Sequence, residues 1–274
     1  MSFTLSHVAA AIPIKDMKTK DGQNLFDLTA LVLGCMAPDF EFYIHLQPIK
    51  QSMSIPYGHT FSGMFFYDLP FCFLFAWIFH TIIKKPLLLH LPQPYAQRYA
   101  KFVRQKWHID LQSLLVFSYS AILAMTIHIL WDSFTHINSP VVQHIVFLSL
   151  PVSIFTHTIP LCKLLDHIGS ITGLATVAYY LYSFDHNVTS DPIIAISAVR
   201  KTFYFAMIVS SGIGLTFYWL YRYGVPSDMN DMAGPIIAFV SGLSIGITLL
   251  SYLFSKVYEL DQPTNLTYNK PTDF

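Results

Sequence analysis

One short stretch holds the densest set of side chains that could do chemistry, and it directly follows an apolar run. The stretch is His128–His136 and the run is Leu111–Ile127. If both belong to one helix, His128, Asp132 and His136 follow one another at four-residue steps and share one face. Ionisable groups inside a membrane-length segment are costly unless something compensates them. A bound metal ion is the simplest compensation, and His followed by Asp four residues later is a workable ligand spacing.

The same three residues have structural alternatives. His128 and Asp132 could form a polar pair that holds two helices together, although an Asp within a span is usually functional. His136 lies about 12 Å along the helix axis from His128, so the two cannot easily share an ion. We expect His136 to bind a second ion, contact a substrate or cap the helix end.

A second group of candidates lies at a proline in the N-terminal part. Pro38 should disturb the preceding helix and free backbone groups, and Asp39 supplies a carboxylate at that break. Asp39 could instead cap the next helix, but we favour a ligand because other ligand candidates exist. Glu41 could act as a general base, orient a ligand or lie as a charge at the membrane interface.

Two single histidines have small neighbours. His59 follows Gly58 at the mouth of an apolar segment, where small residues permit close approach. His7 lies in another short apolar helix, and each of the two is, alone, more often a packed side chain than a ligand. Four further histidines lie at span ends or in loops, where we expect interfacial rings: His80, His90, His108 and His186.

The composition identifies the class of protein. The 274 residues are 53% hydrophobic and 12% charged, whereas soluble globular chains carry roughly 25% charged residues. A soluble protein of this size could not hide so much apolar surface, so we predict a multi-pass membrane protein. A formal net charge of zero gives no electrostatic case for nucleic acid. The three cysteines are far apart, which favours buried thiols over a disulfide framework.

Several segments are long and apolar enough to position these residues across a bilayer. The strongest are Met64–Ile83, Leu111–Thr135, Phe203–Tyr221 and Ile236–Phe254, and Ile168–Phe184 is a shorter candidate. Leu28–Leu46 is ambiguous, and Gln143–Cys162 is interrupted by prolines, so we interpret it as re-entrant or interfacial. We therefore predict an all-α, polytopic transmembrane helical bundle of about five to seven membrane segments, with a polar metal site among its N-terminal helices.

Basic residues predict the orientation. Six of them lie in the loop between the first two strong spans: Lys84, Lys85, Arg98, Lys101, Arg104 and Lys106. That loop should be cytoplasmic by the positive-inside rule. The segment Tyr57–Thr60 and the end of the His128–His136 stretch then face the other side of the membrane.

The domain organisation is simple. Residues 1–258 form one integral-membrane helical domain, in which 1–170 hold nearly all the candidate ligands and 200–256 are apolar helices without candidate chemistry. Residues 259–274 form a polar tail that we expect to be disordered.

Taken together, five blocks resemble a known family. They are TLSHVAA (4–10), MAPDFE (36–41), GHTFS (58–62), HILWDSFTH (128–136) and KLLDHIGS (163–170). In this order they are similar to bacterial multi-pass membrane proteins grouped as domain-of-unknown-function family 4184. That family tends to have Gln at the position of Asp166 and Ser at that of Gly58.

The resemblance implies a location and a chemistry. The family is similar to bacterial inner-membrane proteins described as metal-dependent hydrolases, which share the order His, Pro-Asp, His and His-x-x-x-Asp. That order is also similar to the class of zinc-dependent phospholipase C and P1 nuclease, which hydrolyse phosphoesters. It therefore implies a bacterial cytoplasmic (inner) membrane and a set of metal ligands: His7, Asp39, His59, His128 and Asp132.

The favoured hypothesis is a membrane-embedded metal-dependent hydrolase. The His and carboxylate mix suits one or two zinc ions, with manganese as the alternative. Asp132, Glu41 and His136 are the candidate catalytic residues, and His167 is a second-tier candidate for orientation or substrate contact. A site at the membrane interface suggests membrane lipids as partners and a lipid or lipid-linked phosphoester as substrate; the oligomeric state stays open.

The competing hypothesis is a non-enzymatic transporter or a protein that handles protons or cations through the same groups. A purely structural role as polar helix–helix contacts is the third hypothesis. Clustering discriminates among them, because a hydrolase needs its ligands around one site, whereas a transport path strings them along the bilayer normal. Because the candidates come from separated segments and flank span ends, the sequence favours convergence.

Overall fold

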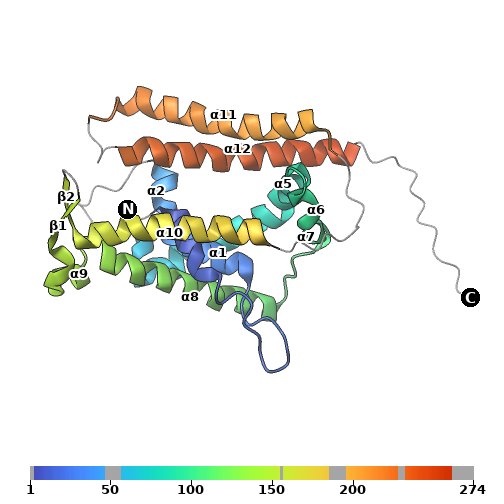
Figure 1. Cartoon of the computed structure of the whole chain (residues 1–274). Coiled ribbons are helices and arrows are strands. Elements are labelled where there is room, and N and C mark those ends of the chain that lie inside the picture. The colour runs from blue at the N-terminus through green and yellow to red at the C-terminus, as the bar shows by residue number, and fades with distance from the viewer. Residues whose placement is uncertain (1–2, 47–56, 155–156, 185–195, 228–231, 261–274) are drawn as a thin grey trace, which may run out of the picture.

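The chain forms a helical bundle with one small β-hairpin (Figure 1). The computed structural model describes residues 3–46, 57–154, 157–184, 196–227 and 232–260. The predicted all-α class is confirmed, because the only strands among these residues are β1 (Pro151–Ile154) and β2 (His157–Pro160). His186 and the part of the predicted tail from residue 261 lie outside the described residues.

Four helices within the described part of the chain are long and apolar enough to cross a membrane. The first runs over Phe61–His90 and is built from α3 (Phe61–Gly63), the π-helical η4 (Met64–Asp68), α4 (Leu69–Ile78), the π-helical η5 (Phe79–Ile83) and α5 (Lys84–His90). The second contains α8 (Leu111–Thr135), the third is α11 (Ala198–Tyr223), and the fourth lies within α12 (Ala233–Leu260). They confirm the four strongest predicted spans, and the chain is an integral membrane protein.

The predicted total of five to seven spans is not confirmed in the part of the chain that the structure describes, and two segments explain the difference. The fifth candidate lies within α10 (Leu161–Ser183), which is long enough but too polar to qualify. The ambiguous segment before residue 46 is divided at Pro38 into α1 (Leu28–Met36), η2 (Ala37–Asp39) and α2 (Phe40–His45). Each piece is shorter than a bilayer requires.

The segment between α8 and α10, which we interpreted as re-entrant or interfacial, contains only short elements. This region contains α9 (Pro140–His144), η6 (Val146–Ser149) and the hairpin, in which Pro151 pairs with Pro160. Its prolines fit short elements better than a continuous helix.

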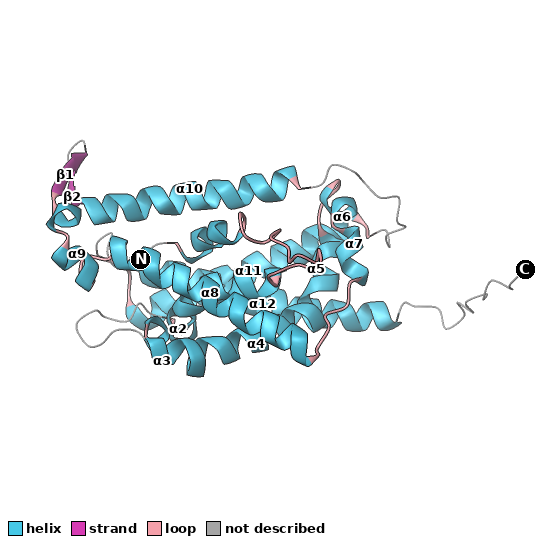
Figure 2. Cartoon of the chain, turned by 90° about the horizontal axis from the view of Figure 1, so that it is seen from below, coloured by secondary structure: helices cyan, strands magenta, loops and turns pink. Residues whose placement is uncertain are grey.

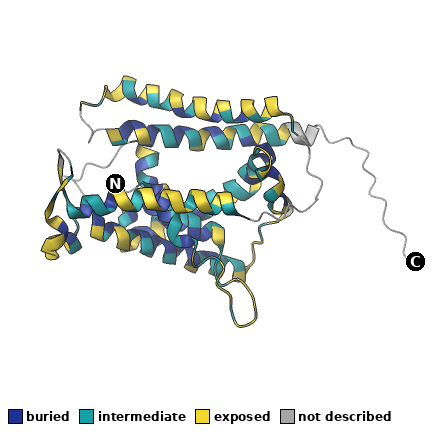
Figure 3. Ribbon diagram, viewed as in Figure 1, coloured by how far each residue is buried: buried dark blue, intermediate teal, exposed yellow. Residues whose placement is uncertain are grey.

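Two layers make up the bundle. In Figure 1, α11 and α12 lie side by side in one layer, and α8 and α10 lie in the other with α1 near them. Figure 2 shows α10 beside α8, and η1 (Thr4–Ala11) contacts both helices. The main core joins α1, α4 and α8 through Ala30, Cys72, Phe117 and Met125, and Figure 3 shows outward faces of α10 and α11 that are largely exposed.

Close approach of α1 to α8 depends on Gly34. A Cβ atom at this position would lie 2.5 Å from the backbone oxygen of Ala121. Any larger residue would therefore push the two helices apart. The three cysteines are buried free thiols, as predicted.

The two ends of the bundle differ in charge. Near the start of α8, Lys84 donates to the carbonyl of Gln105 over 2.6 Å, and Lys201 donates to the carbonyl of Leu91 over 2.6 Å. Basic residues from the separate helices α5 and α11 therefore gather at one end, and the His128–His136 stretch lies at the other end of α8. His90, which we expected at the interface, is fully buried there because its ring stacks on Tyr204.

Candidate metal centre

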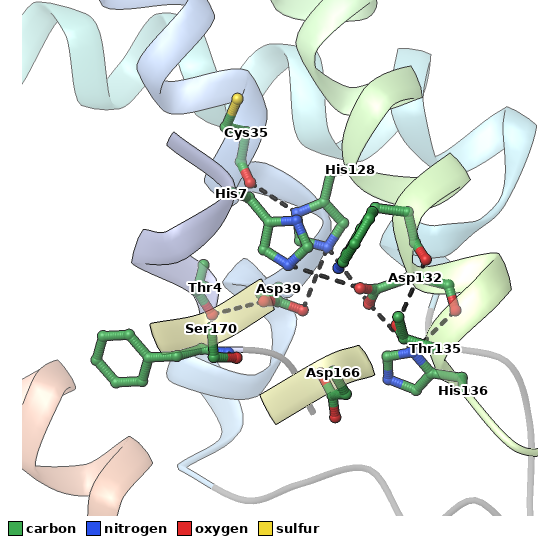
Figure 4. Close-up of polar contacts among 12 residues, drawn as sticks. Thr4, His7, Cys35, Asp39, His128, Asp132, Thr135, His136, Asp166 and Ser170 are labelled. Carbon is green, nitrogen blue, oxygen red and sulfur yellow. Dashed lines mark hydrogen bonds and ion pairs between the residues drawn. The ribbon is translucent and has the colours of Figure 1, made fainter. Parts of the chain in front are cut away.

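The last two turns of α8 supply the centre of the cluster. His128 and Asp132 are both buried, and their Nε2 and Oδ2 atoms are 3.6 Å apart. The other oxygen of Asp132, Oδ1, lies 3.5 Å from Nε2 of His7. One carboxylate therefore faces two imidazoles with different oxygens (Figure 4).

The break at Pro38 supplies a second carboxylate. Asp39 ends η2, is buried, and places Oδ1 3.8 Å from Nε2 of His128. Its Oδ2 accepts a hydrogen bond of 2.5 Å from the hydroxyl of Thr4, which in turn accepts one of 2.8 Å from Tyr43. These bonds fix which oxygen of Asp39 faces the cluster.

His59 joins from a separate turn. It ends η3 (Tyr57–His59), just before the first span. Its Nε2 lies 3.8 Å from Oδ1 of Asp39 and 3.7 Å from Oδ2 of Asp132. Gly58 is necessary beside it, because a Cβ there would lie 2.8 Å from the backbone oxygen of Pro38.

His7 completes the group from η1. Its ring stacks on that of His128, with 3.9 Å between the centroids. Burial lowers the pKa of His7 to about 4; His128 lowers it as well, whereas the carboxylates of Asp132 and Asp39 raise it. His7 is therefore neutral at pH 7, which is the form that binds metal.

A backbone carbonyl of α1 sets the tautomer of His128. Nδ1 of His128 lies 2.6 Å from the carbonyl oxygen of Cys35. Because a carbonyl oxygen only accepts, Nδ1 carries the hydrogen, and the neutral ring then has its lone pair on Nε2. This atom points at the two carboxylates, an arrangement usual for metal-binding histidines.

The five side chains fit a divalent ion. They form two sets whose ligand atoms lie within 4.8 Å of one another, namely His7, His128 and Asp132, and Asp39, His59 and His128. Nitrogen and oxygen ligands of a tetrahedral zinc, at about 2.0–2.1 Å, lie roughly 3.3–3.4 Å apart. The observed separations of 3.5–3.8 Å are close to this value. Nε2 of His7 and Nε2 of His128 are both buried and have no hydrogen-bond partner. Buried polar atoms are usually paired, and a metal ion could be the partner of each.

Of the three remaining candidates, two contact residues of this group or its supporting turn. Nδ1 of His136 lies 3.0 Å from the backbone oxygen of Asp132 and 3.5 Å from its Oδ2. Glu41 lies on α2 and accepts a bond of 3.4 Å from the backbone of Gly58, so it helps to position the turn that holds His59. His167 is exposed on α10 and belongs to neither set of three.

Sequence reasoning gave no role to several polar residues of this region. Asp68 is fully buried in the first span, neither of its oxygens has a hydrogen-bond partner, and a Cβ on Gly58 would lie 3.0 Å from one of them. An Asp inside a predicted span was the signal that could have found it. Asp166, one position before His167, is buried and accepts a bond of 2.8 Å from Lys163. The supporting hydroxyls of Thr4 and Tyr43 carried no such signal.

One comparison with known proteins identifies the family. The family model described as domain of unknown function (DUF4184) matches residues 1–252, which is most of the chain. No curated protein and no solved structure matches it. The chain therefore belongs to the DUF4184 family, whose description states no activity.

Proposed function

We propose that this member of the DUF4184 family is a metal-dependent hydrolase of the bacterial cytoplasmic membrane, acting on a lipid or lipid-linked phosphoester. The observation that supports this most is convergence. His7 and Asp132 are 125 positions apart in the sequence, yet their side chains are 3.5 Å apart. Asp39 and His59 reach the same place from two further segments.

Zinc is the favoured ion and manganese the alternative. Three imidazoles with two carboxylates suit zinc, and a preformed set of ligands costs little to assemble around it. When bound, such an ion would acidify a water molecule and polarise a phosphoryl oxygen. The five side chains would hold one or two such ions.

The protein's own groups have separable roles in this proposal. Asp132 lies among four imidazoles and is the group best placed to accept a proton from a water in the cluster. His136 is partly exposed and would pass the proton outward or contact the phosphoester. Glu41 is a positioning residue, because its carboxylate holds Gly58 beside His59.

The location favours hydrolysis over transport. All five side chains gather near one end of α8 instead of following its length. A transport path would need polar groups along the span, whereas the preceding part of α8 packs Phe117, Ala121 and Met125 into an apolar core. A cluster at a span end would meet a phosphoester at the depth of lipid headgroups.

Elemental mass spectrometry of the protein purified in mild detergent tests the proposal. We expect one or two zinc or manganese ions per chain, which His128→Ala and Asp132→Ala remove while the helical content is kept. His144→Ala is the matched control, because His144 is exposed on α9 and bonds only to its own turn over 2.7 Å. A metal-loaded protein then justifies a screen of lipid phosphoesters. If folded wild-type protein stays without metal after zinc or manganese is supplied again, the proposal of a metal-dependent hydrolase is overturned.

A further inference from the structure

A groove of about 250 Å³ opens beside the cluster and is used by none of the proposed chemistry. It lies between η1, α8 and α10, and His7 belongs both to its wall and to the metal cluster. Ile127 and Trp131, which flank His128 on α8, line it as well. The groove is therefore continuous with the candidate metal centre.

The wall of the groove is apolar. Thr172 and Thr176 line it from α10, but their hydroxyls donate to their own helix, to Ile168 over 2.7 Å and to Thr172 over 2.8 Å. Ala9 and Ala10 line the opposite side from η1. A ligand would therefore meet mostly carbon atoms beyond His7.

Two glycines allow the elements to come this close. A Cβ at Gly173 would lie 2.6 Å from the backbone oxygen of Ser6, and one at Gly169 would lie 2.6 Å from the ring of Trp131. Larger residues at these positions would force α10 away from η1 and α8. The width of the groove is thus set by backbone contact at Gly173 and by the ring of Trp131 at Gly169.

The groove leads from the cluster toward the middle of the span. α10 begins near the cluster, where Asp166 lies (Figure 4), and in its last turn the carbonyl of Tyr182 accepts a bond of 3.0 Å from Arg98 at the basic end. From Gly169 to Thr176 the groove therefore descends about 10 Å along the bundle. Its other wall, at Ile127, belongs to a membrane-spanning helix.

We infer that this groove binds one hydrocarbon chain of a lipid whose phosphoester lies at the metal cluster. This inference rests on the proposed function and names the part of the substrate that the cluster does not bind. The volume is smaller than the roughly 300–1,000 Å³ of pockets for drug-sized ligands, so it suits a chain segment better than a headgroup. A chain in the groove would orient the headgroup at the polar end and give the protein its preference for lipids.

Photolabelling tests the groove directly. The whole protein is reconstituted in vesicles of phosphatidylethanolamine and phosphatidylglycerol that contain a trace of phosphatidic acid with a diazirine in one acyl chain. After irradiation, labelled peptides are mapped by mass spectrometry, and the metal content of the same sample is measured. We expect label to concentrate on η1 and on the part of α10 around Thr172.

Matched tryptophan variants separate the groove from the general lipid surface. Thr172→Trp should fill the groove and reduce labelling there about tenfold, because excluding a few methylene groups is worth at least that factor. Ala178→Trp adds the same ring to an exposed position of α10 that does not line the groove, and should change nothing. Neither residue belongs to the metal cluster, so both variants should keep their metal.

The outcomes distinguish the two proposals. Label spread evenly over the exposed faces of α10 and α11 of metal-loaded protein, with no effect of Thr172→Trp, overturns the groove and leaves the hydrolase intact. Label concentrated in the groove of folded protein that never binds metal supports the groove as a lipid site and overturns the hydrolase.

Discussion

The N-terminal part of the chain and the α11–α12 hairpin are both membrane structures, but they are built in opposite ways. The hairpin consists of two long regular helices that contact each other closely: a Cβ at Gly242 would lie 2.6 Å from the backbone oxygen of Ser211. The N-terminal part divides into short helical pieces, including 3-10 turns at Asp39 and His59.

This difference shows where a membrane protein can place chemistry. In the hairpin the buried polar groups satisfy one another, as when Tyr204 and Ser251 bond over 2.7 Å. In the broken part, buried Nε2 atoms of His7 and His128 have no hydrogen-bond partner. Regular helices satisfy their own polar groups, whereas breaks bring side chains from separate segments to one point.

The largest effect should follow loss of a ligand from the broken part. His59→Ala removes one imidazole from the cluster, and we expect the affinity for zinc to fall by more than about 100-fold, because even partners of ligands matter 10–100-fold. Competition with a chelator measures this affinity. Ser211→Ala in α11 is the control. It removes a hydroxyl that donates to the carbonyl of Gly242 over 2.7 Å and should leave the affinity for zinc unchanged. Equal losses of zinc affinity in both variants would show that the metal site is not confined to the N-terminal part.

The dependence of stability on pH should also be confined to the N-terminal part, since residues 196–260 contain no histidine. The pKa of His7 falls from 6.5 to about 4 on folding, so the unfolded chain takes up a proton first as the pH falls. The contribution of His7 to the stability of the metal-free protein should therefore be fully present above pH 6.5 and should fall by up to about 3 kcal/mol between pH 6.5 and 4.

Thermal unfolding of the metal-free protein across this range measures the effect. His7→Gln, which cannot take up that proton, should flatten the curve. An unchanged slope in His7→Gln would show that another group, and not His7, titrates on unfolding.

A smaller effect should come from the hydroxyl behind Asp39. Thr4→Val keeps the shape of the side chain but removes the bond that fixes the Asp39 carboxylate, and zinc affinity should fall about tenfold. Thr216→Val in α11 is the control, because its hydroxyl bonds only to Gly212 of the same helix over 3.0 Å. Calorimetric zinc titration of both variants would reveal whether the hydroxyl matters.

The smallest expected effect is on the free energy of unfolding when a buried polar group is changed, and its sign should differ between the two regions. Tyr204→Phe breaks a satisfied bond and should lower the free energy of unfolding by about 1 kcal/mol. Asp68→Asn removes a buried carboxylate without hydrogen bonds and should leave stability equal or raise it. Unfolding in detergent, followed by circular dichroism, compares the two variants. A clear destabilisation by Asp68→Asn would show that the Asp68 carboxylate stabilises the fold, as the hydroxyl of Tyr204 does.

Apolarity predicted the membrane helices, because a span must be both long and apolar whatever its neighbours are. It also drew attention to His128 and Asp132, since charges in a span are rare. It could not show that Pro38 divides the segment before residue 46 into short pieces that pack beside α8, or that Glu41 bonds to Gly58 instead of joining the cluster. Those outcomes depend on contacts between segments far apart in the chain, which local pattern does not contain.

The bond from His128 to the carbonyl of Cys35 links the site to the order in which the protein is made. The helix that contains His128 cannot fix its own tautomer, because the acceptor belongs to α1, which is synthesised earlier. Newly made α8 must therefore meet α1 before the cluster exists, and a metal ion of the proposed kind could be acquired only after that meeting. Bound metal would then identify fully folded protein, because a chain in which α8 had not met α1 would not bind the ion.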